Sequence, residues 1–229
     1  AEQRLARALV AEALLRGDRA APSSEEVTER GARYIDFLIP GLLGLNLMSS
    51  SLWGLAFAVV LSRKRGLLKR FAATPMQRHH YLLSYLLSRL GLLGLEVAAL
   101  VAVGWLVFDV GVRGSLGALL LVAMLGAACF GGIGMLIAAR LDNTEVASGW
   151  MNFVMMPMWM LSGSFFSYER FPEVVHPVIR LLPLTALNDA LRAVMRDGES
   201  LPSLWAPLLV LSLWGVLSFV VAARRFRWQ

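Results

Sequence analysis

Residues 63–80, RKRGLLKRFAATPMQRHH, form a basic stretch between two long apolar segments. The stretch contains six Lys and Arg residues and no acidic residue. Short basic loops next to membrane-spanning helices stay on the cytoplasmic side of the membrane. The sequence therefore predicts a cytoplasmic loop here, and this loop sets the orientation of the helices on both sides of it.

The loop also has a helical pattern of its own. Leu67, Leu68 and Phe71 recur at helical spacing on one face, whereas Lys69 and Arg70 point to the other face. This pattern predicts an amphipathic surface helix. Two interpretations remain open: the helix lies on anionic lipid, or it docks a cytoplasmic partner.

The overall composition indicates an integral membrane protein. Hydrophobic residues make up 57% of the chain, charged residues only 17%, and the mean hydropathy is +0.62. The net charge of +6 comes from cations at the ends of apolar runs, which favours membrane orientation over nucleic-acid binding. The single cysteine, Cys129, excludes a disulfide or a cysteine metal site within one chain. We expect it to serve packing.

Five apolar segments are long enough to span a membrane, which takes about 20 residues. They cover residues 37–61, 81–108, 116–139, 147–166 and 204–223. Thr74 and Pro75 form a typical helix start just before the second segment. Glycines in the third segment predict close helix approach. We expect an all-α fold.

The C-terminal cations after residue 223 place the tail inside, so five spans place residues 1–34 outside as an amphipathic extracytoplasmic segment. Residues 35–229 then form the transmembrane domain. A translocated N-terminus without a signal peptide is hard to insert. We therefore expect the natural protein to have a sixth, upstream spanning helix that this sequence lacks.

Residues 167–201, between the fourth and fifth segments, are too polar to span. The sequence predicts two short amphipathic helices here, residues 172–182 and 185–196. Pro183 separates them, and Gly198 is the stop signal of the second. We expect them to lie on the outer leaflet or to dip into it. They serve either as a cap that packs the bundle or in substrate release.

Charged side chains inside the spans are functional candidates. Arg89 and Glu96 are seven residues apart, so they project from nearly the same face about 10 Å apart along the axis. A charge at membrane depth usually faces the bundle interior or water, although Arg89 could instead extend toward the inner surface. With Asn152 of the fourth span, these residues are candidates for a translocation path or for contacts between helices. No catalytic or metal-binding motif is found, so the sequence gives no support for an enzyme.

Three stretches together resemble one membrane-protein family. They are YIDFLIPGLLGLNLMSSSLWGLAFAVVLSRKRGLLKRFAATPMQRHHYLLSYLLSRL from residue 34, LSGSFFSYERFP from residue 161 and LLPLTALNDALR from residue 181. In this order they resemble the permease subunit of type 2 ATP-binding-cassette (ABC-2) exporters. Permeases of that family have six spanning helices, pair with a second permease copy or homologue, and are driven by an ABC ATPase subunit that binds ATP and Mg.

The resemblance implies roles for two segments. Residues 65–75 match the family's cytoplasmic coupling helix, which docks the ATPase, and residues 172–196 match its paired outer helices. The implied docking residues are Arg65, Gly66, Leu67, Leu68, Lys69, Arg70, Phe71, Thr74 and Pro75. The chain differs from the family in two ways: Leu67-Leu68-Lys69 stands where many members carry acids, and the family's first helix and outer domain are absent from this sequence.

We therefore expect a multi-pass permease of the cell membrane, in a bacterium the inner membrane. It would export a lipophilic or amphiphilic substrate (a drug, lipid or glycan-like molecule) while a partner hydrolyses ATP. We expect contact with membrane lipids, no nucleic acid, no cofactor bound by this chain, and no catalytic residue or metal. The alternative is a non-transporting membrane scaffold or accessory subunit.

The predicted topology can be tested by cysteine labelling. In a variant without Cys129, a cysteine at Arg65 should react with a membrane-impermeant maleimide only from the cytoplasmic side, because the basic loop lies inside. A cysteine at Glu199 should react only from the outside. Labelling of both positions from one side would contradict this topology.

Overall fold

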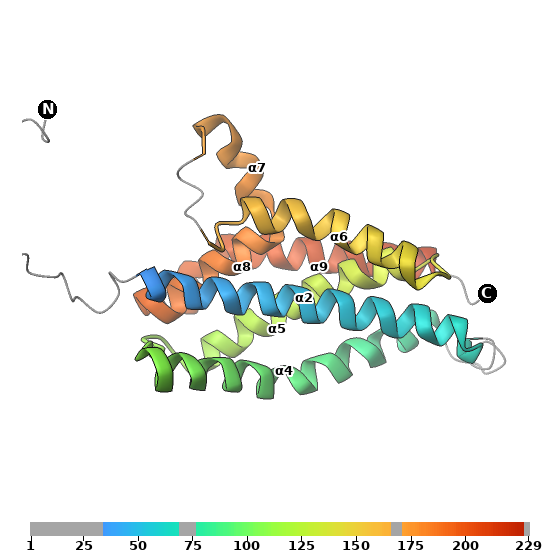
Figure 1. The fold of residues 1–229 in the computed structure, drawn as a ribbon, viewed down its shortest axis with the longest axis horizontal. Coiled ribbons are helices and arrows are strands. Elements are labelled where there is room, and N and C mark those ends of the chain that lie inside the picture. The colour runs from blue at the N-terminus through green and yellow to red at the C-terminus, as the bar shows by residue number, and fades with distance from the viewer. Residues whose placement is uncertain (1–33, 69–76, 166–170, 227–229) are drawn as a thin grey trace, which may run out of the picture. The chain divides into compact units, whose positions relative to one another are not determined.

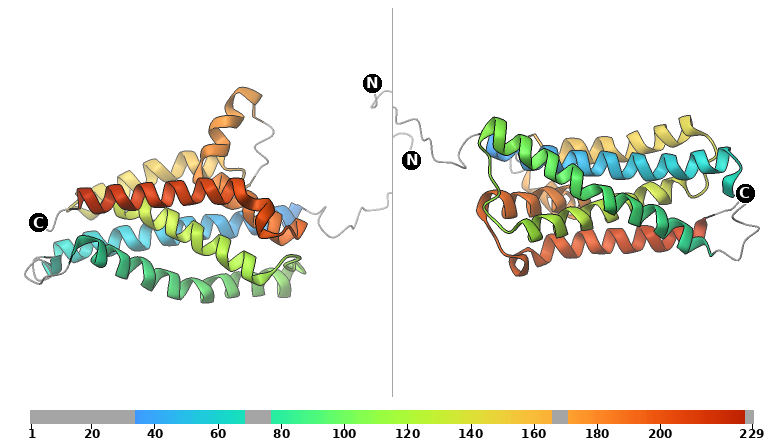
Figure 2. Two further views of the ribbon diagram at one scale, coloured as in Figure 1. Left: turned by 180° about the vertical axis from the view of Figure 1, so that it is seen from behind. Right: turned by 90° about the horizontal axis from the view of Figure 1, so that it is seen from below.

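The structure is a computed structural model that describes residues 34–68, 77–165 and 171–226, and every regular element in these ranges is helical. Five helices run side by side along the length of the bundle (Figures 1 and 2). They are α2 (Tyr34–Lys64), α4 (Arg78–Phe108), α5 (Leu116–Ala138), α6 (Thr144–Leu161) and α9 (Trp205–Arg225). The predicted all-α fold is confirmed for the described residues. The N-terminal segment 1–33 lies outside them.

Four of these helices, α2, α4, α5 and α9, are long and apolar enough to cross a membrane. Their bounds agree closely with four of the predicted spans. The fifth predicted span, 147–166, corresponds to α6, which has 18 residues but does not reach the same apolarity. Glu145, Asn152 and Pro157 lower its hydropathy. The described residues therefore support four spans by length and composition, not the predicted five.

Short polar residues define where the helices begin and end. The Ser115 hydroxyl accepts a hydrogen bond from the Gly117 backbone N–H (3.2 Å) at the start of α5, and Asn143 accepts one from Glu145 N–H (2.8 Å) at the start of α6. At the end of α4, Asp109 adopts the left-handed conformation with φ 56°. These caps satisfy backbone groups that the helix termini leave without partners.

Helix α5 forms the centre of the bundle, packed between α2 and α9. A Cβ atom on Gly134 would lie 2.5 Å from the Leu52 carbonyl oxygen of α2, and one on Gly132 would lie 3.2 Å from the Gly215 carbonyl oxygen of α9. Such close approach requires glycine, so the predicted small-residue packing of this helix is confirmed. Cys129 is buried in the same core, as expected for a packing residue.

The connection between α6 and α9 folds back into the bundle. It contains η2 (Glu173–Val175), α7 (His176–Leu181), α8 (Pro183–Arg192), the π-helical η3 (Ala193–Asp197) and η4 (Leu201–Leu204). Helix α8 packs against α2, α5 and α9 and is almost entirely buried, whereas α7 projects away from the bundle (Figure 1). The prediction of two short helices is correct in outline. Pro183, however, is the first residue of α8 and not a separator, because proline fits the first helical turn.

Gly198 ends the helical stretch formed by α8 and η3, as the sequence predicts. It has φ 71° and follows η3 directly, so the chain leaves the helix through a left-handed residue. Within this segment, α8 inserts between the long helices and does not lie flat on their ends.

Candidate functional site

Helix α2 presents a stripe of small and polar residues on its open side, between α4 and α6. Asn46 and Gly54 are exposed, and Ser49 and Ser50 are half-buried. These residues fall in the middle third of the helix at helical spacing. We call these four residues the polar stripe.

The structure brings Arg89 and Glu96 together next to this stripe. One guanidinium nitrogen of Arg89 forms a salt bridge with the Glu96 carboxylate and also donates to the Ser50 hydroxyl. Its Nε donates to the Ser51 hydroxyl at 3.3 Å. Arg89 therefore pairs with an acid on its own helix and also links α4 to α2.

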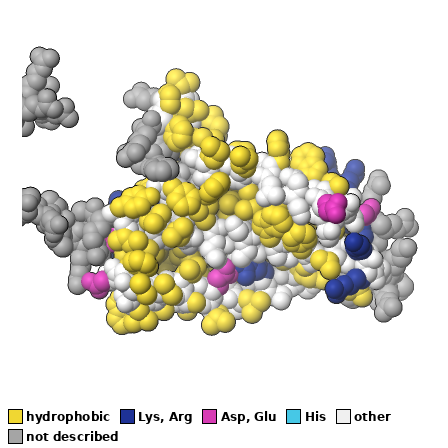
Figure 3. Space-filling view, in the orientation of Figure 1, with side chains coloured by type: hydrophobic (Ala, Val, Ile, Leu, Met, Phe, Trp, Pro, Cys, Tyr) yellow, Lys and Arg dark blue, Asp and Glu magenta, His cyan; other side chains and the backbone are white. Residues whose placement is uncertain are grey.

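This charged pair is only partly shielded by the protein. The side chains of Arg89 and Glu96 are 15% and 21% exposed, and they lie in the central part of α4. Figure 3 shows an acidic and a basic side chain side by side in the middle of the face, while the other charged side chains of this face gather at its ends. Because the two charges neutralise each other, the pair adds polarity to the stripe without net charge.

Asn152 lies on the other side of the polar stripe. It is exposed on α6 and lines a groove of about 500 Å³ between α6 and α2, together with Ser49 and apolar side chains such as Met156 and Trp159. The two helices are linked beside this groove, because the Trp53 indole N–H of α2 donates a hydrogen bond to Met155 Sδ of α6 (2.9 Å). The three candidate residues of the spans thus flank the same stripe, Arg89 and Glu96 from α4 and Asn152 from α6.

A second polar cluster, which sequence reasoning missed, closes the end of this region at which α2 begins. The Asn188 side-chain amide on α8 donates to the Ser164 hydroxyl (2.8 Å) and to the Ser162 carbonyl (3.3 Å), and the two serine hydroxyls are 2.9 Å apart. All three residues are buried. The sequence held one signal for this cluster: Asn188 lies on the otherwise apolar face of an amphipathic helix, next to Leu184, Leu187 and Leu191 in the helical pattern.

Arg192 and two glycines complete this cluster. The Arg192 guanidinium donates to the Gly163 carbonyl (2.5 Å) and lies over the Phe37 ring, 3.8 Å from its centroid. A Cβ atom on Gly41 would lie 2.5 Å from the Ser164 carbonyl oxygen, and one on Gly44 only 2.0 Å from Asn188 Oδ1. The first turns of α2, the end of α6 and helix α8 are therefore held in direct contact.

At the C-terminal end of α2, Arg63 has a structural role beyond its charge. Its buried guanidinium donates to the carbonyl oxygens of Ala138 (3.0 Å), Ala139 (2.9 Å) and Leu141 (2.5 Å), and its Nε is 3.4 Å from an Asp142 carboxylate oxygen. A cation at the C-terminus of α5 satisfies carbonyl groups that the helix leaves without partners. Arg63 thus connects α2 to α5 and to the loop that precedes α6.

The first residues of the predicted coupling helix follow α2 directly in the chain. Gly66 has φ 73° and ends the turn after α2, and the chain is helical again at Leu67 and Leu68. Leu68 is 1% exposed and packs in the core, Leu67 is half-buried and Arg65 is exposed. The remaining predicted docking residues lie outside the described residues. They are Lys69, Arg70, Phe71, Thr74 and Pro75.

Comparisons with known proteins agree with this architecture. Residues 8–195 match the family described as ABC-2 type transporter. The chain is 31% identical over 106 residues to Nodulation protein J of Neorhizobium galegae, covering 46% of this chain and 40% of that protein. It is 24% identical over 172 residues to the inner membrane transport permease YhhJ of Escherichia coli (strain K12), covering 74% of this chain and 46% of that protein.

A third relative is the probable multidrug ABC transporter permease YbhS of the same strain, 27% identical over 168 residues, which cover 71% of this chain and 44% of that protein. The chain spans less than half the length of the curated relatives it matches. Since the family match extends over more than half of the chain, the chain belongs to the ABC-2 type transporter family and is a multi-pass transmembrane permease.

Proposed function

We propose that this chain is the membrane subunit of an ABC exporter that moves a lipophilic or amphiphilic molecule out of the cytoplasm. A partner ATPase, with ATP and Mg, supplies the energy. The observation that carries the proposal is a polar stripe at mid-depth of α2 in a chain that belongs to the ABC-2 family. The names of two relatives, an inner membrane transport permease and a probable multidrug permease, favour the bacterial inner membrane and a drug-like substrate.

The polar stripe needs a covering surface other than lipid. Polar and charged groups that face hydrocarbon are costly, and in membrane proteins they face other helices or a water-filled path. A second permease copy related by a two-fold axis would bring the stripe opposite its own counterpart. Asn46, Ser49 and Asn152 would then line a path between the two copies, with Met156 and Trp159 as its apolar surfaces.

This arrangement also explains the composition of α6. We infer that α6 is a fifth span whose polar residue Asn152 faces the path and not lipid, which is why the helix is less apolar than its neighbours. A path with polar and apolar walls and a neutralised Arg89–Glu96 pair suits an amphiphile better than a small ion. The mixed polar and apolar lining of the path is therefore the reason for proposing an amphiphilic substrate.

The proposed contact with the ATPase can be tested by substituting its aromatic residue, Phe71. Phe71→Ala combined with Leu67→Ala should weaken binding of the partner ATPase about thirtyfold, because a buried aromatic anchor contributes roughly 2 kcal/mol to an interface. Co-purification of the ATPase with the permease measures this loss. Leu68 is not a suitable probe, since it packs in the permease core.

The matched control neutralises Lys69 and Arg70, which the sequence pattern places on the opposite face of the predicted helix. If the helix docks the ATPase through its apolar face, Lys69→Ala with Arg70→Ala should leave co-purification largely intact. Normal ATPase recovery with the Leu67 and Phe71 variants would refute docking. It would favour a helix that lies on lipid, in a scaffold or accessory subunit.

The Arg89–Glu96 pair can be tested by removing one charge or both. Glu96→Gln leaves the Arg89 cation without its acid, which should lower the stability of the folded protein by about 1–3 kcal/mol. Arg89→Gln combined with Glu96→Gln should recover much of that stability, because no single charge is left. Thermal unfolding of the purified protein and substrate transport in vesicles would each be measured for the unsubstituted protein and for the two variants. Equal stability and normal transport in all three proteins would show that the pair is only a tolerated polar position.

A further inference from the structure

The ends of four long helices meet around Arg63, one residue before the end of α2. Its guanidinium donates to the last carbonyls of α5, as described above, and its Cζ atom lies 5.6 Å from the centroid of the Phe226 ring, directly after α9. The same ring is 5.6 Å from the ring of Tyr81 in the first turn of α4. We call Arg63, Tyr81, Asp142 and Phe226 the Arg63 cluster.

The Arg63 cluster is closely packed. The side chain of Arg63 is 6% exposed, Tyr81 is 2% exposed and Phe226 is fully buried. A hydrogen bond of 2.9 Å between the Ser62 and Tyr85 hydroxyls joins α2 to α4 beside the cluster. If the guanidinium lost its carbonyl partners, a buried cation and buried carbonyl groups would be left without hydrogen bonds, which is unfavourable. We therefore expect these ends of α2, α4, α5 and α9 to move together.

The cluster also reaches α6, which carries one side of the proposed path. Arg63 donates to the Leu141 carbonyl, and its Nε is 3.4 Å from an Asp142 carboxylate oxygen. The next residue, Asn143, is the N-cap of α6. One guanidinium thus connects the two helices that line the path: α2, to which it belongs, and α6, through the loop that leads into it.

The predicted coupling segment, residues 65–75, is next to this cluster in the chain. It begins two residues after Arg63 and ends three residues before Arg78, the first residue of α4. Arg63 and Tyr81 therefore hold the two helices between which the segment lies. A displacement of either helix end would act directly on the Arg63 cluster.

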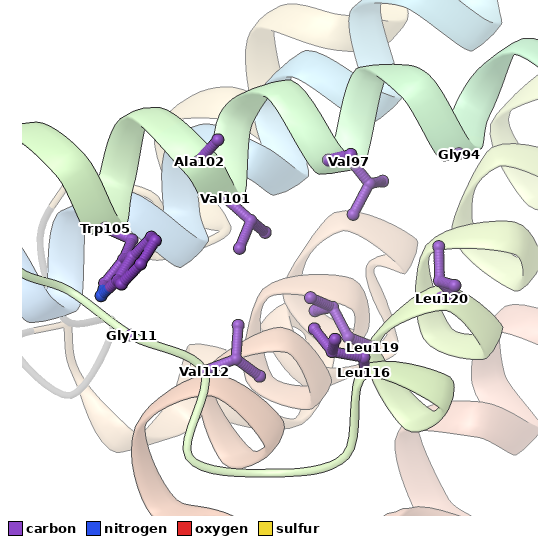
Figure 4. A pocket seen from close by; sticks show the side chains of 11 residues that line it. Gly94, Val97, Val101, Ala102, Trp105, Gly111, Val112, Leu116, Leu119 and Leu120 are labelled. Carbon is purple, nitrogen blue, oxygen red and sulfur yellow. The ribbon is translucent and has the colours of Figure 1, made fainter.

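Farther along, α4 and α5 are less closely joined. An apolar groove of about 650 Å³ lies between the second half of α4 and the start of α5, and Figure 4 shows Val101 and Trp105 of α4 across it from Val112 and Leu119. Apolar side chains across an open groove can slide past one another, whereas a guanidinium fixes its partners in a planar geometry. The Arg63 end of these helices is therefore better suited to transmit a displacement than the groove end.

We propose that Arg63 is a positioning residue that couples the 65–75 segment to the transport path, because it makes α6 follow a displacement of α2. This inference rests on the proposed exporter function, in which an ATPase displaces the segment. When the C-terminal end of α2 moves, the guanidinium carries the α5–α6 loop with it, and both sides of the path change together. Without Arg63, α2 would move and α6 would stay behind.

A cysteine probe on α6 tests this coupling. The full-length permease in complex with its ATPase, without Cys129, would carry a cysteine at Met156, which is 60% exposed and lines the groove between α6 and α2. Its rate of reaction with a maleimide would be measured in nanodiscs without nucleotide and with Mg, ADP and vanadate, which trap the ATPase in a nucleotide-bound form. We expect nucleotide to change the rate when Arg63 is present, and Arg63→Gln to abolish that change.

Two further variants separate coupling from charge and from stability. Lys64→Gln removes the exposed cation next to Arg63 and should leave the response to nucleotide intact. Arg63→Lys keeps the charge, but an ammonium group does not reproduce the planar fork that binds three carbonyls, so the response should be reduced. Thermal unfolding and ATPase co-purification would be measured for each variant. A merely structural role would lower the unfolding temperature without changing the response to nucleotide.

Two results would overturn the proposal. One is an equal response to nucleotide in the Arg63 variants and in the unsubstituted complex, and the other is no response at Met156 in the unsubstituted complex. If Arg63→Gln does not fold, a full response in Arg63→Lys overturns the proposal by itself. Failure of the exporter function is distinguishable, since the unsubstituted permease would then recover no ATPase.

Discussion

The absence of water in the hydrocarbon interior of a membrane is the constraint on which this structure depends. Each polar group at depth must find a partner within the protein or face a solvated path. The Arg63 Nη1 and Nη2 groups meet this requirement on the terminal carbonyls of α5, and the Asn188 side-chain N–H groups meet it on the serines that follow α6. Arg89 meets it on Glu96 and on two serines of α2. The three clusters fix α2 near its C-terminal end, at its middle and near its N-terminal end.

Much of this could be predicted from the sequence, because apolar length and charge position are local properties. The four long helices and the proximity of Arg89 to Glu96 follow from residue spacing alone. The insertion of α8 was harder to predict, since Asn188 bonds to a loop 24 residues earlier in the chain. Arg63 is similar: its position in a basic run indicates orientation, but its contacts with the end of α5 depend on how the helices pack. Composition alone supports four spans and leaves the predicted fifth unconfirmed, because α6 is less apolar than the other four long helices.

The two sides of α2 differ in packing and in polarity, and this difference supports the proposed function. One side packs so closely on α5 that glycine is required at the contact, and this fixes the helix in the bundle. The other side carries the polar stripe and remains open between α4 and α6. A helix with one tightly packed side and one open polar side at mid-depth can line a path while it stays rigidly attached to the rest of the subunit. The basic loop that follows α2 is directly continuous with it, so a force applied to that loop by an ATPase would reach the stripe through one helix.

The most direct test of this account is whether the polar stripe faces a second copy. In a variant without Cys129, a cysteine at Asn46 should be cross-linked to its counterpart in another copy by a short bifunctional maleimide in membranes, giving a covalent dimer on a denaturing gel. A cysteine at Leu213, 63% exposed near the middle of α9, serves as the control and should not be cross-linked. A dimer formed through Asn46 and not through Leu213 is the predicted result. No dimer at Asn46, or equal dimer at both positions, would contradict the assignment of this face to the translocation path.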